Sequence, residues 1–119
     1  MADIYIEAFK DLPLEMPAVA VSEDSHAWHL FPVRIKTEAG IDRARFIERM
    51  SELGIGCSVH FIPLHLHPYW RDTYNLLPGM FPVAQGIFEQ EVSLPLYTKM
   101  TDDDQIRVIN AVKQVLLDV

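Results

Sequence analysis

The sequence predicts an α+β fold, a two-layer sandwich of strands and helices. Short stretches that alternate apolar and polar residues are typical of strands, and other stretches repeat apolar residues at helical spacing. The expected order is strand, helix, strand, loop, helix, strand and helix. Strands and helices that each have one apolar face pack together in two layers. A chain of 119 residues, half of them hydrophobic, is long enough to form one such domain with its own core.

The N-terminal residues 1–17 are expected to form a tether rather than a packed element. Pro13 and Pro17 break a helix soon after its apolar residues, because proline lacks an N–H group and restricts the residue before it. A frayed arm is the alternative. The domain itself is predicted for residues 18–119.

The first strand is predicted within residues 27–36. Phe31, Val33 and Ile35 alternate there with polar residues, and Pro32 indicates an edge or a bulge. A helix follows Gly40 and Asp42 and ends at Gly54, which takes the left-handed conformation easily. Its apolar stripe is Phe46, Ile47, Met50 and Leu53, and its charged residues are expected to face solvent.

A second short strand is predicted for Cys57–Phe61, with Cys57, Val59 and Phe61 on the packed face. Ser58 and His60 would then point the other way. Pro63 ends this strand, and residues 64–70 follow as an apolar loop rich in histidine and aromatic residues. Such a loop usually lines a site or an interface, because exposing it to water is costly.

The remaining elements are a short helix, a strand and a long final helix. The short helix begins near Pro82, which suits a first turn, and its inward stripe would be Ala84, Ile87 and Phe88. The strand covers residues 92–96. Thr101 and Asp104 have the spacing of a capping box at the start of the last helix. The residues expected to be largely buried in the core are Phe46, Met50, Val59, Phe61, Val112 and Leu116.

Three segments resemble a known family in the same order. One segment consists of Gly54-Ile55, Val59–His65 and Pro68-Tyr69, and it resembles the signature of the DegT/DnrJ/StrS sugar aminotransferases. The other two segments, Ala27–Arg34 and Val92–Asp103, resemble two further family segments. Members of this family use pyridoxal phosphate (PLP) to aminate keto-sugars carried on nucleotides. The likeness runs from about Tyr5 onward and covers only the family's small C-terminal domain.

The resemblance implies a small, mostly antiparallel sheet backed by helices. It also implies that His60 and Phe61 lie beside the sugar of the substrate, and that His65, which matches the second family histidine, is a substrate-binding residue as well. We expect His60 to be accessible to solvent and to have no strong partner within the chain. The implied partners are the large PLP-binding domain, a second subunit of a homodimer and a nucleotide-sugar substrate. The implied role is substrate contact and active-site closure in the biosynthesis of polysaccharide or secondary-metabolite sugars.

The lysine that binds PLP in this family lies in an S-x-x-K segment of the large domain. None of Lys10, Lys36, Lys99 and Lys113 has a serine three residues before it. There is also no glycine-rich phosphate loop. We therefore expect that the chain alone contains no catalytic residue, holds no PLP and is inactive.

Two other classes of function are open from the residues alone. Cys57, His60, His65 and His67 have the spacing C-x2-H-x4-H-x-H and could bind zinc, although a strand would place Cys57 and His60 on opposite faces. The second alternative is a non-catalytic protein-interaction domain. Its binding patch would consist of the apolar loop and the aromatic residues Trp28, Tyr69, Trp70 and Tyr74.

Composition argues against several other classes. The net charge of −7 argues against nucleic-acid binding. No apolar run approaches the ~20 residues of a membrane span, and we expect no signal peptide. The one cysteine cannot form an internal disulfide, which fits a cytoplasmic location.

Overall fold

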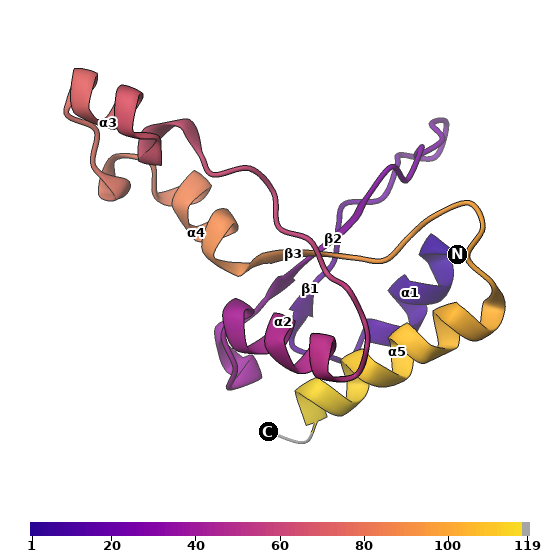
Figure 1. The fold of residues 1–119 in the computed structure, drawn as a ribbon. Coiled ribbons are helices and arrows are strands. Elements are labelled where there is room, and N and C mark those ends of the chain that lie inside the picture. The colour runs from indigo at the N-terminus through magenta and orange to yellow at the C-terminus, as the bar shows by residue number, and fades with distance from the viewer. Residues whose placement is uncertain (118–119) are drawn as a thin grey trace.

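The computed structural model describes residues 1–117, which form a small α+β domain (Figure 1). This confirms the predicted fold class. The antiparallel sheet has the order β1–β2–β3. The elements are α1 (Ala2–Phe9), β1 (Leu14–Glu15), β2 (Phe31–Ile35), α2 (Arg43–Glu52), α3 (Pro68–Tyr74), α4 (Pro82–Gln90), β3 (Glu91–Leu94) and α5 (Asp102–Leu117), with short 3-10 turns η1 (Thr37–Ala39), η2 (Leu64–Leu66) and η3 (Pro78–Met80).

The core lies between the sheet and the helices α1, α2 and α5, which gather in the lower part of Figure 1. The apolar residues of β2 are buried at alternate positions, as predicted. The stripes of α2 and α5 meet them, and Phe46, Met50 and Val112 are completely buried. The helix starts and stops are also as expected. Thr101 and Asp104 exchange the two hydrogen bonds of a capping box, at 3.0 and 3.1 Å. The bonds that the Thr101 backbone N–H and hydroxyl donate to the Asp104 carboxylate lower the pKa of Asp104.

The N-terminal residues do not form the expected tether, because α1 is a packed element. Tyr5 and Phe9 are completely buried and their rings stack at 5.4 Å. The Tyr5 hydroxyl donates to the Pro95 carbonyl at 2.9 Å. The side-chain amide of Gln105 on α5 donates to the Met1 carbonyl at 2.7 Å. The prolines come after the end of this helix, so they do not prevent it. That residues 1–17 join two domains remains a prediction.

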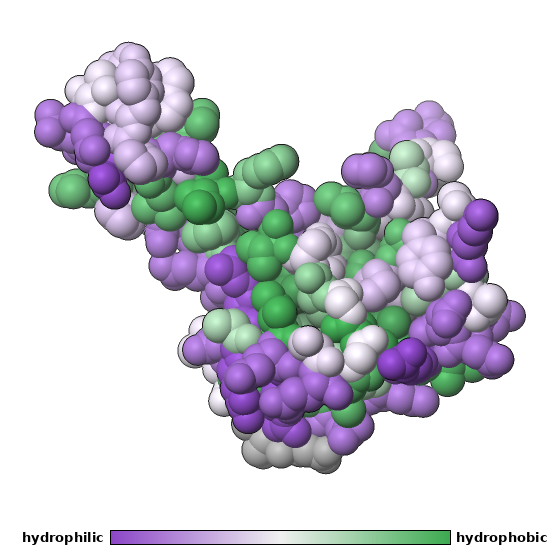
Figure 2. Space-filling view, in the orientation of Figure 1, coloured by the Kyte–Doolittle hydropathy of each residue, from purple (hydrophilic) through white to green (hydrophobic). Residues whose placement is uncertain are grey.

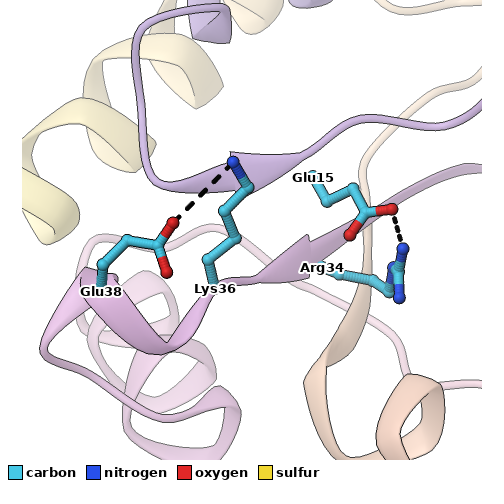
Figure 3. A network of polar contacts seen from close by, with 4 residues as sticks. All are labelled: Glu15, Arg34, Lys36 and Glu38. Carbon is cyan, nitrogen blue, oxygen red and sulfur yellow. Dashed lines mark hydrogen bonds and ion pairs between the residues drawn. The ribbon is translucent and has the colours of Figure 1, made fainter.

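The strand β2 lies in the middle of the sheet, whereas Pro32 was expected at an edge or bulge position. However, β1 pairs only with Arg34 and Ile35, and Pro32 is paired with Ser93 of β3 alone. Ser93 directs its own N–H and C=O to Ser58, so the missing N–H of Pro32 faces the side that β1 leaves unpaired. Pro32 therefore occupies a local edge position. Figure 3 shows the exposed side of this region, where Arg34 pairs with Glu15 and Lys36 lies 3.9 Å from Glu38.

The segment Cys57–Phe61 does not form the predicted strand. Its only ladder contact among residues 1–117 is a bridge between Ser58 and Ser93. Cys57 contacts the core, but Val59 is 40% exposed and Phe61 is 97% exposed. The expected burial of both side chains is therefore wrong. One bridge fixes one residue, and the chain beyond it turns away from the sheet.

Residues 62–90 form a projection that we call the arm (Figure 1, upper left). It contains η2, α3, η3 and α4, so the stretch expected to be a loop is largely helical. The predicted inward stripe of α4 is also wrong, because Ala84 and Ile87 are exposed and Phe88 is half-buried. The arm gives the domain a radius of gyration of 15.9 Å, whereas a compact domain of this length has about 13.5 Å.

Candidate functional site

A cleft of about 380 Å³ lies where the arm joins the sheet. Figure 2 shows hydrophobic residues along the base of the arm and on the adjoining body. Two of the residues that line the cleft are ionisable, His60 and Glu91. The others are apolar. Pro32 lies on β2, Phe61 and Pro63 lie just before η2, and Ala84, Ile87 and Phe88 lie on α4. The cleft therefore combines apolar walls with one histidine–carboxylate pair.

His60 is held at this cleft by the backbone on one side and by a carboxylate on the other. Ser58 and Ser93 exchange two backbone hydrogen bonds of 3.1 and 2.8 Å, which bring the segment alongside β3. The Nδ1 atom of His60 lies 2.8 Å from Oε2 of Glu91. The side chain of His60 is 46% exposed and that of Glu91 only 8%. The expected accessibility of His60 is confirmed, but the expectation that it has no internal partner is wrong.

Glu91 is the functional candidate that sequence reasoning missed. It is the first residue of β3, and its other carboxylate oxygen, Oε1, accepts a hydrogen bond from the Ser93 hydroxyl at 3.2 Å. A buried carboxylate is tolerated only when it is hydrogen-bonded. The sequence contained one signal: Glu91 and Ser93 alternate with Val92 and Leu94, which places both polar side chains on one face of the strand.

Phe61 lies at the rim of the cleft with its ring almost fully in solvent. Nothing in residues 1–117 covers most of the ring. That Phe61 lies beside a substrate stays a prediction. An aromatic residue exposed to this extent indicates a surface that another molecule or domain covers.

His65 and His67 lie in the arm and are not among the residues that line the cleft. His65 is 4% exposed, stacks on Phe81 at 4.9 Å and lies 3.0 Å from the amide oxygen of Gln85. These contacts tie η2 to α4, so they support the arm. His67 is exposed, and its Nε2 atom lies 3.0 Å from the Ile62 carbonyl.

The zinc alternative does not fit this arrangement. Within residues 1–117 no three His, Cys, Asp or Glu side chains are grouped so as to bind a metal ion. His60 is paired with Glu91, and His65 with Gln85. Partial burial raises the pKa of the Cys57 thiol to about 11, which disfavours the thiolate that a metal needs.

The raised pKa predicts that Cys57 reacts slowly with iodoacetamide. The thiol reacts as a thiolate, and at pH 8 a pKa of about 11 instead of 9.0 lowers the thiolate fraction by about a hundredfold. The alkylation rate of the folded chain should therefore be about a hundredfold below that of the urea-unfolded chain, measured by mass spectrometry. Equal rates would contradict the burial of the thiol.

The aromatic patch of the interaction-domain alternative is split between two places. Trp28 packs against Phe31 in the body at 5.6 Å. Tyr69, Trp70 and Tyr74 belong to α3 at the far end of the arm, where Trp70 stacks on Tyr74 at 5.7 Å. These four residues therefore do not form a single binding patch. No helix within residues 1–117 is both long and apolar enough to span a membrane.

Comparison with known proteins gives one consistent result. The model of the DegT/DnrJ/EryC1/StrS aminotransferase family matches residues 1–113. The chain is 47% identical over 117 residues to the uncharacterized protein MJ1066 of Methanocaldococcus jannaschii. It is 36% identical over 118 residues to the spore coat polysaccharide biosynthesis protein SpsC of Bacillus subtilis. Each match covers 98% of this chain and 30% of the relative, so the chain spans less than a third of the length of these proteins.

A solved structure gives the same match in three dimensions. NtdA from Bacillus subtilis, which contains the bound cofactor PMP, superposes on 98% of the chain with a TM-score of 0.78 and 31% identity. The match covers 27% of the NtdA chain. The arm and the cleft are included in the span that the family model matches.

Proposed function

Since the chain belongs to the DegT/DnrJ/EryC1/StrS aminotransferase family, we propose that it is the small domain of a PLP-dependent aminotransferase acting on a nucleotide-linked keto-sugar. Its role is to contact the sugar and to complete the closure of an active site whose other part lies in a large domain. The observation that supports this role is the cleft, in which an accessible histidine and an exposed aromatic ring stand next to each other.

The chemistry of the cleft suits a sugar. The C–H face of a sugar ring is apolar and packs on aromatic rings, which Phe61 offers at the rim. The hydroxyls of a sugar need hydrogen-bond partners, which His60 offers at the same place. SpsC, named for spore coat polysaccharide biosynthesis, supports a sugar of this kind as the substrate.

The residues of this chain do not fit the role of holding PLP. Residues 1–117 contribute no lysine to the lining of the cleft. Lys10 and Lys36 face solvent and pair with Glu7 and Glu38. The cofactor, which NtdA binds as PMP, is therefore assigned to the large domain. When bound there, it supplies the electron sink for amino transfer.

The exposed apolar residues of the arm support a second domain or subunit as the partner. Leu64, Leu77 and Val83 are each more than 60% exposed although they are large and apolar. Large apolar side chains that are exposed on one projection often mark a surface that is covered in an assembly. We assign it to the large domain, with a second subunit of the homodimer completing the active site.

The proposal predicts that the chain alone forms no covalent adduct with PLP. The purified chain is mixed with PLP, freed of excess cofactor, reduced with borohydride and weighed by mass spectrometry. The expected mass is that of the unmodified chain, with NtdA as the positive control. A stoichiometric adduct on one specific lysine would show that the cofactor belongs to this domain and would contradict the proposal.

A further inference from the structure

The position of Glu91 at the base of the cleft determines what His60 can do. The cross-strand neighbour of Glu91 is Arg34, but the guanidinium of Arg34 pairs with Glu15. The carboxylate of Glu91 is instead shared between His60 and Ser93, one oxygen each. On α2, the Arg43 guanidinium donates to the carbonyl of Phe88 on α4 and lies over the Phe88 ring at 4.8 Å. His60 is thus the basic group that faces this carboxylate.

This contact selects one of the two neutral forms of the imidazole ring. An ionised carboxylate can only accept hydrogen bonds, so the nitrogen that faces it must carry the proton. The nitrogen 2.8 Å from Glu91 is Nδ1. In a neutral ring, Nε2 then has a free lone pair and is a hydrogen-bond acceptor. The second bond, from Ser93, holds the carboxylate in place and so limits rotation of the ring.

We propose that Glu91 is a positioning residue, which fixes the tautomer and the orientation of His60 so that Nε2 accepts a hydrogen bond from a sugar hydroxyl in the cleft. This inference rests on the proposed function. It also determines specificity, because an acceptor binds a hydroxyl but not a keto oxygen, which is itself an acceptor. His60 would therefore contact a hydroxyl of the sugar rather than the carbon that is aminated.

The composition of the cleft favours a hydroxyl over a phosphate at this position. A phosphate is usually bound by Arg, Lys or several backbone N–H groups. Apart from His60, the residues that line the cleft are apolar or, in the case of Glu91, acidic. The negative charge of Glu91 would repel a phosphate, whereas it has little effect on a neutral hydroxyl.

The tautomer can be measured on this chain by long-range ¹H–¹⁵N NMR of the histidine rings at alkaline pH. The His60 signals are those that disappear in the His60→Asn variant. In this variant the Asn amide can replace Nδ1 as the donor to Glu91, so the other histidine signals should stay unchanged. We expect the Nδ1–H form in the unmodified chain. In Glu91→Gln, the amide oxygen can face Ser93 and the amide nitrogen can donate to Nδ1, so we expect the Nε2–H form.

The matched control is Glu89→Gln, which removes a carboxylate that accepts from Gln85 instead. It should leave His60 in the Nδ1–H form. An Nε2–H ring in the unmodified chain, or an unchanged tautomer in Glu91→Gln, would overturn the positioning role. If Glu91→Gln does not fold, the tautomer of the unmodified chain still decides between the two outcomes.

Kinetics of the full-length enzyme separate this inference from the proposed function. If both are right, Glu91→Gln and His60→Asn each lower kcat/KM, and the double variant loses no more than the larger single loss. If Glu91→Gln switches the tautomer but kcat/KM is unchanged, the contact between His60 and the sugar is overturned, whereas the positioning of the ring by Glu91 stands. A loss of kcat/KM without a switch of the tautomer would overturn the positioning alone.

Discussion

Replacing Phe46 with alanine should lower the free energy of unfolding by about 3–5 kcal/mol. The side chain is completely buried in the core cluster, on the α2 stripe that packs with the sheet and α5. The substitution removes the transfer free energy of the ring and leaves a cavity that the neighbours fill only in part. Because small domains have about 5–15 kcal/mol of stability in total, the loss could unfold a large fraction of the chain.

The matched control is Phe61→Ala, the same substitution at an exposed position. The Phe61 ring is 97% exposed, so its removal should change the unfolding free energy by no more than about 0.5 kcal/mol. Urea denaturation followed by circular dichroism measures both variants. Equal effects in the two variants would show that α2 does not pack as described.

Replacing His60 in the full-length enzyme should lower kcat/KM by about tenfold to a hundredfold. Without His60, the sugar hydroxyl in the closed site loses its acceptor, and an unsatisfied buried donor costs about 1–3 kcal/mol. When this cost is present in the transition state, it converts into that loss of rate. PLP binding should be unaffected, because the cofactor is assigned to the other domain. Steady-state kinetics with the keto-sugar and the absorption spectrum of the cofactor measure the two effects.

The choice of variant matters because His60 has two partners. His60→Ala removes the contact with the substrate and also leaves the buried carboxylate of Glu91 with only Ser93. His60→Asn keeps a donor for Glu91 and removes only the Nε2 side. Unchanged kinetics in both variants would exclude His60 from the site, and loss of PLP would show that it has a role in cofactor binding.

The elements that the sequence predicts well are those with strong local signals. The capping box at Thr101, the glycine with positive φ at position 54 and the stripes of α2 and α5 each lie within a few residues of the structure they determine. The alternation in β2 was equally reliable, because a strand buried on one face needs a period of two. The accessibility of His60 was also expected, but its offset from Val59 and Phe61 is not the reason, because both of those side chains are exposed as well.

The parts that failed depend on contacts between distant segments. The alternation in Cys57–Phe61 is typical of a strand, but the sheet offers this segment only one bridge, at Ser93. The prolines suggested an unpacked N-terminus, whereas the decisive contact is that of Tyr5 with Pro95 at the other end of the chain. The pair of His60 and Glu91 joins two elements across the whole arm, and no local pattern indicates such a pairing.

That pairing has a consequence for the dynamics of the domain. The arm leaves the body just after His60 and returns at Glu91, so the two residues meet where it begins and ends. A projecting segment whose two ends are held together can unfold locally as its own cooperative unit. The free energy of this local unfolding is well below that of global unfolding. The helices of the arm have few buried residues, whereas α5 is part of the core. Amide hydrogens of the arm would then exchange through local unfolding, whereas those of α5 would exchange only when the whole domain unfolds.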